Sequence, residues 1–505
     1  MTERRWFIAI ICLLIFVVAY RERDDVTPLR ASETGGPPNV INGYAHNTVP
    51  DGVIGGTVSG GGNVGFPNQV MGDFGTIGGG LGNEGTGQSV VAGGYNNTTT
   101  AYYTAIGGGS DNLATGGSST IAGGKRNTTH FAFSTIGGGS FNTANGLSTT
   151  VGGGTANTAH GERSTVGGGT QNVADGLEST VAGGTRNEAS NAYAAIGGGI
   201  ENQAGGRRSA IAGGAGNNAA GEDATIGGGL SNQAVDRYST VAGGRANRAG
   251  TANDTVEDAR YATVGGGQDN VAEGLGATVG GGLENMASGD FSGIAAGSGN
   301  HAAGHYSFAV GHRAQIDADH SGALLLADST AADFASDAAN EFAVRATGGV
   351  RLVTAVDENG QPLAGVQLEP GSGTWQTLSD RSAKTNIAPV NEQEILTLLM
   401  SLPVSVWSYK SQDAGIRHIG PMAQDFYTTF GFGEDERYLT TIDVDGVTLA
   451  ALQGLYQVVQ SQDTQISDQQ QMIKSLTAEN AALFARLSAL EARFASLEQS
   501  ISKIK

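Results

Sequence analysis

Between residues 71 and 303, an Ile or Val recurs at a fixed spacing in an otherwise small and polar sequence. From Val91 to Val241 the step is fifteen residues every time, and the step from Val241 to Val264 is longer by eight residues. A fixed short period is typical of one structural unit stacked on its copies, each too small to bury an apolar face alone. The apolar column consists of Ile77, Val91, Ile106, Ile121, Ile136, Val151, Val166, Val181, Ile196, Ile211, Ile226, Val241, Val264, Val279 and Ile294.

Two more columns of residues recur with the same spacing as the Ile or Val column. Six residues after each Ile or Val lies an Asn, and two residues further on Ala recurs in most units. The Asn column comprises Asn83, Asn97, Asn112, Asn127, Asn142, Asn157, Asn172, Asn187, Asn202, Asn217, Asn232, Asn247, Asn270, Asn285 and Asn300. Fifteen residues are too few for a pair of helices and suit one coil of a β-solenoid.

We therefore predict a mainly β fold for residues 71–330, in which each Ile or Val points inward from a short strand. The glycines after it allow the positive φ and close backbone approach of a bend. The Asn side chains stack into an inward ladder of amides that satisfies its own hydrogen bonds. Coils about 4.8 Å apart give a rod on the order of 70 Å long. The polar stretch 251–258 is expected as a loop inserted in one coil, and residues 26–70 as a linker with irregular first coils.

One Ile or Val and one Ala per coil make a thin core, which favours oligomerisation. With these columns, the repeat resembles the head of trimeric (YadA-like) autotransporter adhesins, in which three chains form a left-handed β-roll. The closing coil at 304–329 resembles the end of such heads most closely. The resemblance implies a homotrimer.

The composition changes after the repeats. We predict a β-rich connector at 331–377 and a small α+β domain at 378–460. Its expected elements are a helix at 391–402, a strand at 404–410, a short helix closed by Gly at 420–431 and a strand running into a turn at 440–446.

From Val447 to the end, apolar residues recur in two seams of a seven-residue repeat, which is typical of a coiled coil at 461–505. Asn480 in a core position sets register and in general favours dimers, which conflicts with a trimer. The first seam contains Leu452, Val459, Ile466, Ile473, Asn480, Leu487, Phe494 and Ile501, and the second contains Leu455, Leu476, Leu483, Leu490, Leu497 and Ile504, broken by Gln462 and Gln469.

The overall charge narrows the class of partner. The chain of 505 residues carries a formal charge of −20, which argues against nucleic acid. A single Cys excludes a disulfide framework within one chain. The histidines show no repeated pairing, so neither a metal nor a cofactor is expected.

The N-terminal segment has basic residues followed by fifteen apolar ones at 6–20. This pattern fits either a cleaved signal peptide within 1–25 or an uncleaved membrane anchor with its N-terminus inside. Both place the rest of the chain outside the cell, at the surface or in the medium. A buried cytoplasmic helix is the third interpretation.

The repeats themselves offer no catalytic spacing. A Thr column precedes many of the inward residues and is expected to face outward; it is either a plain β-forming face or a flat surface for glycan or ice. Its members are Thr120, Thr135, Thr150, Thr165, Thr180, Thr225, Thr240, Thr263 and Thr278. A polysaccharide depolymerase would need two carboxylates in a groove, and no such pair stands out.

Ser379 and Lys384 are the candidate chemical pair. A Lys that loses its proton on desolvation can take the proton of a Ser hydroxyl, although a helix cap and a solvated Lys are the alternative interpretation. The motif LSDRSAKTNI (378–387), followed by IRHIGPMAQDF (416–426) and IDVDGV (442–447), closely resembles the intramolecular chaperone auto-processing domain of phage endosialidases and tail spikes.

That resemblance implies Ser379 as nucleophile and Lys384 as its general base, in a domain that is released by self-cleavage after a trimer has assembled. It places the broken bond at Ser379–Asp380, with Leu378–Ser379 as the second choice. Asp380 and Arg381 match the first motif and are expected to orient the pair. The second motif is matched by His418, Gly420, Gln424 and Asp425, with a structural role as reasonable as a catalytic one. Ser382–Ala383 replaces bulkier residues of relatives, which affects efficiency.

The sequence thus predicts an exported, trimeric, adhesin-like fibrous protein that matures as a single-turnover serine autoprotease, with a glycan or another cell-surface ligand. The alternative is a glycan- or ice-binding solenoid whose C-terminal domain only holds three chains together.

Overall fold

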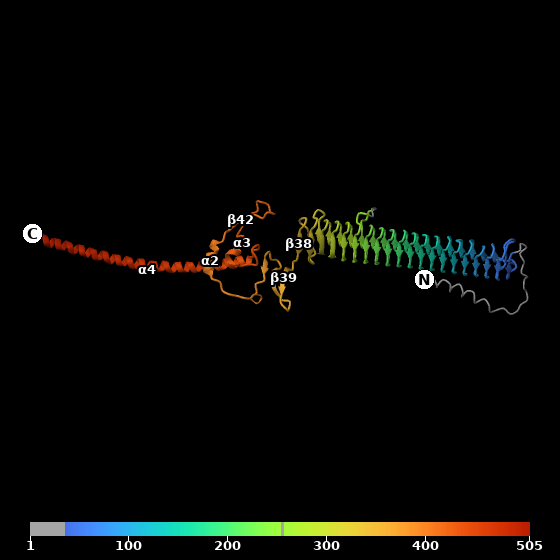
Figure 1. The fold of residues 1–505 in the computed structure, drawn as a ribbon, viewed down its shortest axis with the longest axis horizontal. Coiled ribbons are helices and arrows are strands. Elements are labelled where there is room, and N and C mark those ends of the chain that lie inside the picture. The colour runs from blue at the N-terminus through green and yellow to red at the C-terminus, as the bar shows by residue number, and fades with distance from the viewer. Residues whose placement is uncertain (1–35, 254–256, 505) are drawn as a thin grey trace. The chain divides into compact units, whose positions relative to one another are not determined.

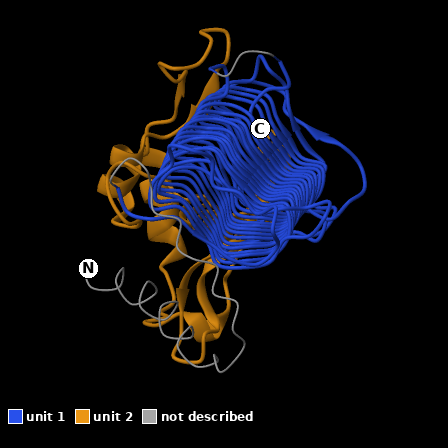
Figure 2. Cartoon of the chain, turned by 90° about the vertical axis from the view of Figure 1, so that its right-hand side faces the viewer, with its two compact units in different colours: residues 1–352, 367–376 blue, residues 353–366, 377–505 orange. Residues whose placement is uncertain are grey.

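The computed structural model describes residues 36–253 and 257–504. The chain divides into two compact units, residues 1–352 with 367–376, and residues 353–366 with 377–505 (Figure 2). The predicted signal peptide or anchor at 1–25 lies outside the described residues. Among the helices that are described, none is long and apolar enough to cross a membrane.

In the first unit the chain winds into a β-solenoid whose coils stack in register (Figures 1 and 2). Each regular coil contributes two strands of two residues, one to each of two parallel ladders. In the first ladder β10 (Thr120–Ile121) pairs with β12 (Thr135–Ile136), and in the second β11 (Thr128–Thr129) pairs with β13 (Thr143–Ala144). A third row of single bridges, such as Ser110 with Lys125, links the coils between the ladders. The predicted solenoid is confirmed.

The first ladder contains 20 strands and continues past residue 330. Its strands are β1 (Val40–Ile41), β2 (Thr57–Val58), β4 (Thr76–Ile77), β6 (Val90–Val91), those at fifteen-residue steps from β8 (Ala105–Ile106) to β26 (Thr240–Val241), β28 (Thr263–Val264), β30 (Thr278–Val279), β32 (Gly293–Ser298), β34 (Phe308–His312), β36 (Leu324–Ala327) and β38 (Phe342–Arg345). The second consists of β3 (Gln69–Val70), β5 (Glu84–Gly85), β7 (Thr98–Thr99), those at fifteen-residue steps from β9 (Leu113–Ala114) to β27 (Arg248–Ala249), β29 (Val271–Ala272), β31 (Met286–Ala287), β33 (His301–Ala302), β35 (Ala314–Ile316) and β37 (Phe334–Ala335).

The solenoid interior contains the columns that the sequence predicts. Every Ile or Val of the apolar column is 0–1% exposed, and the Ala column that faces it is equally buried. The Thr residues that precede the Ile or Val point outward and are exposed or half-buried, as expected. Inward and outward positions alternate because successive side chains of a strand point to opposite faces.

The Asn column forms the predicted amide ladder. Asn127 is fully buried, and its side-chain amide donates to the carbonyls of Gly123 and Gly139 at 2.9 and 3.0 Å. Its backbone N–H donates to Oδ1 of Asn112 at 3.0 Å. The same pattern repeats from coil to coil, so each buried amide is satisfied by the coils on both sides. Gly124 permits the bend with a φ of +96°, where a Cβ would meet the carbonyl of Gly139.

The inserted loop at 251–258 leaves the ladders unbroken, since β26 pairs directly with β28. Asp236 holds both ends of the loop with one buried carboxylate. Its Oδ2 accepts the backbone N–H of Thr251 at 3.0 Å and that of Ala259 at 2.9 Å. The two coils therefore stay in register although eight extra residues separate them.

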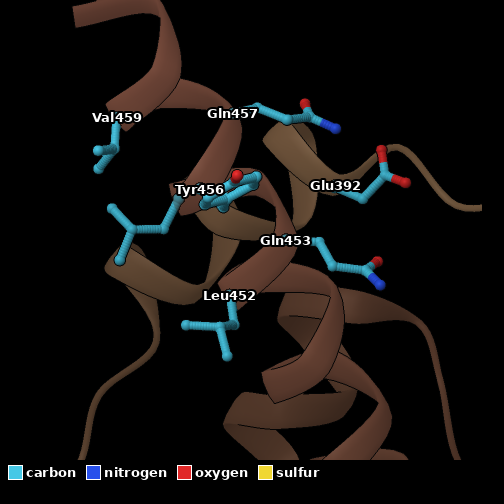
Figure 3. A pocket seen from close by; sticks show the side chains of 7 residues that line it. Glu392, Leu452, Gln453, Tyr456, Gln457 and Val459 are labelled. Carbon is cyan, nitrogen blue, oxygen red and sulfur yellow. The ribbon is translucent and has the colours of Figure 1, made fainter. Parts of the chain in front are cut away.

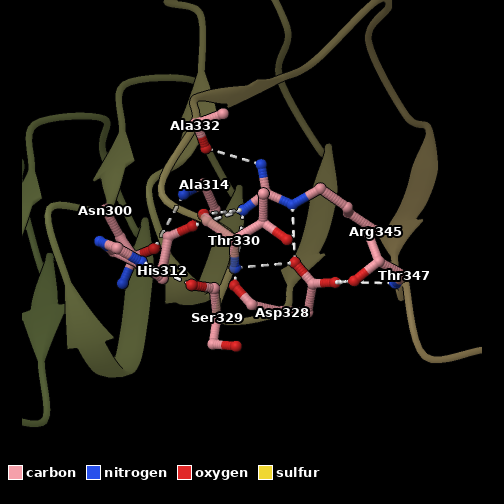
Figure 4. Close-up of polar contacts among 9 residues, drawn as sticks. All are labelled: Asn300, His312, Ala314, Asp328, Ser329, Thr330, Ala332, Arg345 and Thr347. Carbon is pink, nitrogen blue, oxygen red and sulfur yellow. Dashed lines mark hydrogen bonds and ion pairs between the residues drawn. The ribbon is translucent and has the colours of Figure 1, made fainter.

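An ion pair closes the last coils (Figure 4). Arg345 on β38 donates to Oδ1 of Asp328 at 2.9 Å and to the carbonyls of His312, Thr330 and Ala332. The Asp328 carboxylate also accepts the N–H and hydroxyl of Thr347 at 2.7 and 2.6 Å. These bonds satisfy carbonyl groups that the next coil would otherwise satisfy.

A three-stranded sheet follows, with β40 (Pro362–Leu368) between β39 (Val350–Val356) and β41 (Trp375–Thr377). The second unit then contains α2 (Glu392–Ser401), the antiparallel pair β42 (Ser405–Trp407) and β43 (His418–Gly420), α3 (Ala423–Phe430) and α4 (Thr441–Ser502). The Asn391 side chain caps α2, and Gly431 ends α3 in the left-handed region.

The helical part packs around a small core of Ile395, Leu402, Phe426, Val447 and Ala451. Gly454 lets α4 approach α2 closely, because a Cβ there would overlap the Glu392 carbonyl. Beyond this contact α4 extends alone, and the apolar residues of both seams are exposed in the single chain; Leu476 and Leu483, for example, are 51% and 60% exposed.

The strand predicted at 440–446 is wrong. These residues form the first turns of α4, and Thr440 caps the helix by accepting the N–H of Asp443 at 3.2 Å. An alternating pattern over so few residues does not separate strand from helix. The Thr cap and the acidic residue in the first turn favour the helix.

Candidate active site

Ser379 lies directly after the three-stranded sheet. Strand β41 ends at Thr377, and the N–H of Leu378 still donates to the carbonyl of Gly365 on β40 at 3.1 Å. The peptide before Ser379 is therefore held by the sheet, while the residues after it leave the sheet.

Asp380 shapes the turn that follows. Its Oδ1 accepts the backbone N–H of Ser382 at 2.7 Å and the Ser382 hydroxyl at 2.5 Å, which caps the 3-10 helix η1 (Arg381–Ala383). The bonds from the Ser382 hydroxyl and N–H lower the pKa of Asp380 because they stabilise the carboxylate. At the other end of η1, the N–H of Lys384 donates to the Arg381 carbonyl at 3.2 Å.

This turn brings the two predicted catalytic residues together. Lys384 Nζ donates to Ser379 Oγ at 2.5 Å, although five residues separate them in the chain. Both side chains are exposed in the single chain. Water stabilises an exposed ammonium, and an ammonium can only donate. The contact places an amine and a hydroxyl within hydrogen-bond distance, which is the spacing that a serine nucleophile and a lysine base would need.

The second motif occupies different surroundings. His418 on β43 stacks on Trp407 at a ring distance of 4.7 Å, and its Nε2 donates to Oε1 of Gln412 at 2.9 Å. The ring also meets the edge of Tyr409. These three partners all lie between Trp407 and His418 in the chain, which favours a structural role for His418.

Gln424 and Asp425 lie in the first turn of α3. Met422 at the cap offers no side-chain hydrogen bond, so the Asp425 carboxylate stabilises the N-terminus of the helix through its dipole. Among the residues that the structure describes, no hydrogen bond joins His418, Gln424 or Asp425 to Ser379 or Lys384.

Sequence reasoning missed the role of Ser382. It was noted only as a departure from relatives, yet its hydroxyl and N–H complete the Asp380 cap. The signal was present, because an Asp two residues before a Ser is typical of a local side-chain turn. Arg381 contributes its carbonyl to the turn, and its side chain is exposed.

Comparison with known families points to the same segment. Residues 379–431 match the profile of a peptidase family described as Chaperone of endosialidase. The matched segment begins at Ser379 and includes Lys384 and the second motif, residues 416–426. No curated protein matches the chain. The chain thus combines a β-solenoid with a C-terminal segment that is similar to this chaperone and peptidase family.

Proposed function

We propose that this chain is an exported fibrous protein that assembles as a homotrimer and then removes its own C-terminal segment by cleavage beside Ser379. The observation that carries the proposal is the contact between Lys384 Nζ and Ser379 Oγ, inside the segment that matches the chaperone family. The product that remains is the solenoid, which serves as an adhesin-like rod for a glycan or another cell-surface ligand.

Helix α4 supplies the surface for assembly. Leu452, Leu455 and Val459 line an open apolar groove with Tyr456, beside Glu392 of α2 (Figure 3). The same stripe continues along the helix to its end. Burying one such side chain contributes roughly 1.5–3 kcal/mol, so a seven-residue repeat of this length supports association with identical helices.

Association at the C-terminal end would fix the register of the three repeat arrays. Three rods of nearly identical coils can pair in many registers shifted by whole coils. If the C-terminal helices associate first, they align the three chains and raise the effective concentration of the neighbouring coils. The solenoids then associate from that end in one register.

Assembly would also bury Ser379 and Lys384, which are exposed in the single chain. Neighbouring copies that cover Lys384 would remove the water around its ammonium and favour the neutral amine. The neutral amine accepts the Ser379 proton and makes the hydroxyl a nucleophile. Cleavage is thereby restricted to the trimer, and loss of the aligning segment traps the rod kinetically.

A second candidate function has support from one observation. The outward Thr residues pair in register over successive coils, for example Thr120 with Thr135 and Thr150 with Thr165. Such a row suits a flat ligand such as glycan or ice, although Ala195 and Ala210 interrupt it. In that case the C-terminal segment is only a trimerisation module.

The test is to compare full-length wild type with Ser379→Ala, each shown by sedimentation to be trimeric. We expect two fragments by denaturing gel and intact mass in the wild type, and one intact chain in Ser379→Ala. An uncut wild-type trimer would contradict self-cleavage and leave the trimerisation module. Binding to a glycan array and inhibition of ice growth then test the Thr row.

A further inference from the structure

We propose that the three-stranded sheet of β39, β40 and β41 packs its apolar face against the same face of the other copies in the homotrimer. This inference rests on the homotrimer of the proposed function and assigns one of the surfaces that hold it together. The apolar face consists of Val350, Leu352, Thr354, Val356, Pro362, Ala364, Val366, Leu368, Trp375 and Thr377.

The sheet is bare in the single chain. No residue of its three strands is buried, and the side chains of Leu352, Val356 and Trp375 are 54%, 55% and 53% exposed. The part of the chain that the structure describes therefore does not cover the sheet. Because a sheet with an apolar face must bury that face against another layer, the missing layer has to come from outside the chain.

The turn between β39 and β40 fixes which of their side chains share a face. The N–H of Asp357 donates to the carbonyl of Gln361 at 2.9 Å, which closes a hairpin. Counting back along both strands from this bond places Val350 opposite Leu368. Side chains alternate between the faces of a strand, so Leu352 lies on the same face as this pair.

A side-chain hydrogen bond fixes the third strand in the same way. Gln367 on β40 donates through Nε2 to Oε1 of Gln376 on β41 at 3.1 Å, so these two side chains lie on one face. Their neighbours Leu368 and Trp375 lie on the opposite face, because successive side chains alternate. One row of Val350, Leu368 and Trp375 therefore crosses all three strands.

The absence of charge on this face favours a second copy as the partner. None of its ten residues is charged, whereas Arg351 lies on the opposite face beside Gln367. The whole chain carries a formal charge of −20, so most surfaces of two identical copies would repel each other. A face without charge meets its own equivalent without that repulsion.

The size of the face explains why the sheets depend on the rest of the chain. Three strands about 4.8 Å apart, each of about seven residues at roughly 3.4 Å, give a face on the order of 300 Å². A standard interface buries about 800 Å² on each partner. Sheets of separate chains would not associate by themselves, but association of the α4 helices would raise their effective concentration. The three apolar faces then form one shared core.

The experiment measures the solvent access of Trp375 in the full-length chain, with Ser379→Ala present throughout to keep the chain whole. Acrylamide quenching of tryptophan fluorescence is recorded with and without Trp375→Phe, so that the difference reports on Trp375. Leu476→Asp, which places a charge in the apolar stripe of α4, supplies the monomer. We expect free quenching in the monomer and a several-fold lower quenching constant in the trimer.

Two neighbouring substitutions test the face itself. Leu368→Glu places a charge on the apolar face, and Gln367→Glu places the same charge on the opposite face as the matched control. In trimers held together by α4, Leu368→Glu should raise the quenching of Trp375 towards the level of the monomer. Gln367→Glu should keep the protection of the parent trimer. Equal protection in both variants would overturn the inference.

Three further outcomes separate this inference from the homotrimer on which it rests. A trimer in which Trp375 is quenched as in the monomer would overturn the inference and leave the homotrimer standing, with the face open to another partner. Protection of Trp375 in the Leu476→Asp monomer would overturn it as well, because the chain would then cover its own sheet. A Ser379→Ala chain that sediments as a monomer would overturn both.

Discussion

Lys384 donates a hydrogen bond to Ser379 across 2.5 Å, yet both side chains remain exposed to solvent. The pair is therefore assembled by local structure alone, through the capped turn that separates the two residues. Under the proposed function, burial of Lys384 in the assembled trimer is what converts its ammonium into a base. Chemistry at this site should depend on association, whereas its geometry should not.

Lys384→Arg should abolish cleavage and leave assembly intact. A guanidinium keeps its charge in proteins and cannot accept the Ser379 proton. The loss of a general base typically lowers a rate by roughly 10²–10⁴-fold. The measurement is the cleavage rate of trimeric protein by denaturing gel. Lys410→Arg serves as the matched control, and equal rates for wild type and Lys384→Arg would contradict the role of Lys384.

Asp380→Ala should slow cleavage more than Asp380→Asn, because the amide oxygen can still accept from Ser382. The lowered pKa of Asp380 means that the carboxylate form of the cap is present above the ordinary pKa of an aspartate. It is lost as the pH falls through the lowered value. Ser382→Ala should have a smaller effect in the same direction. Rates measured against pH test this, and an Asp380→Ala trimer that cleaves at the wild-type rate would refute the positioning role.

Leu476→Asp should prevent both trimer formation and cleavage. The change places a charge in the apolar stripe of α4, where each copy would lose roughly 1.5–3 kcal/mol of burial and gain repulsion. Ser475→Asp, one position away and outside both seams, is the control that should still assemble. Sedimentation equilibrium gives the oligomeric state. Cleavage by a monomeric Leu476→Asp chain would show that association is not required.

Asn127→Ala should destabilise the solenoid by roughly 2–5 kcal/mol, because it leaves partners in its own coil and in the next coil without hydrogen bonds. These partners are the carbonyls of Gly123 and Gly139 and the N–H of Asn142. Thr128→Ala on the outer face should change stability by no more than about 0.5 kcal/mol. Urea unfolding followed by circular dichroism compares the two variants, and equal midpoints would show that the ladder adds nothing.

Acid should loosen the last coils of the solenoid before the rest. The hydroxyl and N–H of Thr347, with those of Thr330, hold the pKa of Asp328 well below its usual range. Its contribution to stability is therefore complete above the ordinary pKa of an aspartate and is lost as the pH falls towards the lowered one. Protection of residues 324–345 against hydrogen exchange, relative to the rest of the solenoid, should fall at low pH, and Asp328→Asn should already show reduced protection at neutral pH. An unchanged exchange rate in both cases would contradict this.

The repeat columns could be predicted because a solenoid is nearly one-dimensional. Ile121 meets Ile136, and Asn112 meets Asn127, so each interior residue contacts its own equivalent in the next coil. The period of the sequence is then the period of the contacts. The helix α2 and its Asn391 cap followed from equally local signals.

Only part of the site could be predicted from the sequence. Ser379 and Lys384 came from a resemblance, and spacing alone would not have paired them. Local structure decided the pairing, because the Asp380–Ser382 cap bends the chain back by one turn. For His418 the motif left both a structural and a catalytic role open, and the structure stacks its ring on Trp407 in the β42–β43 region.

The sequence by itself determined the coil, its inward columns and the unpartnered stripe of α4, because each depends on residues at one fixed spacing. Tertiary structure decided two other features. Asp236 clamped both ends of the inserted loop, and Arg345 closed the last coils with Asp328. Each of these depends on a hydrogen bond between groups at irregular separations in the chain, and a repeat period carries no information about such contacts.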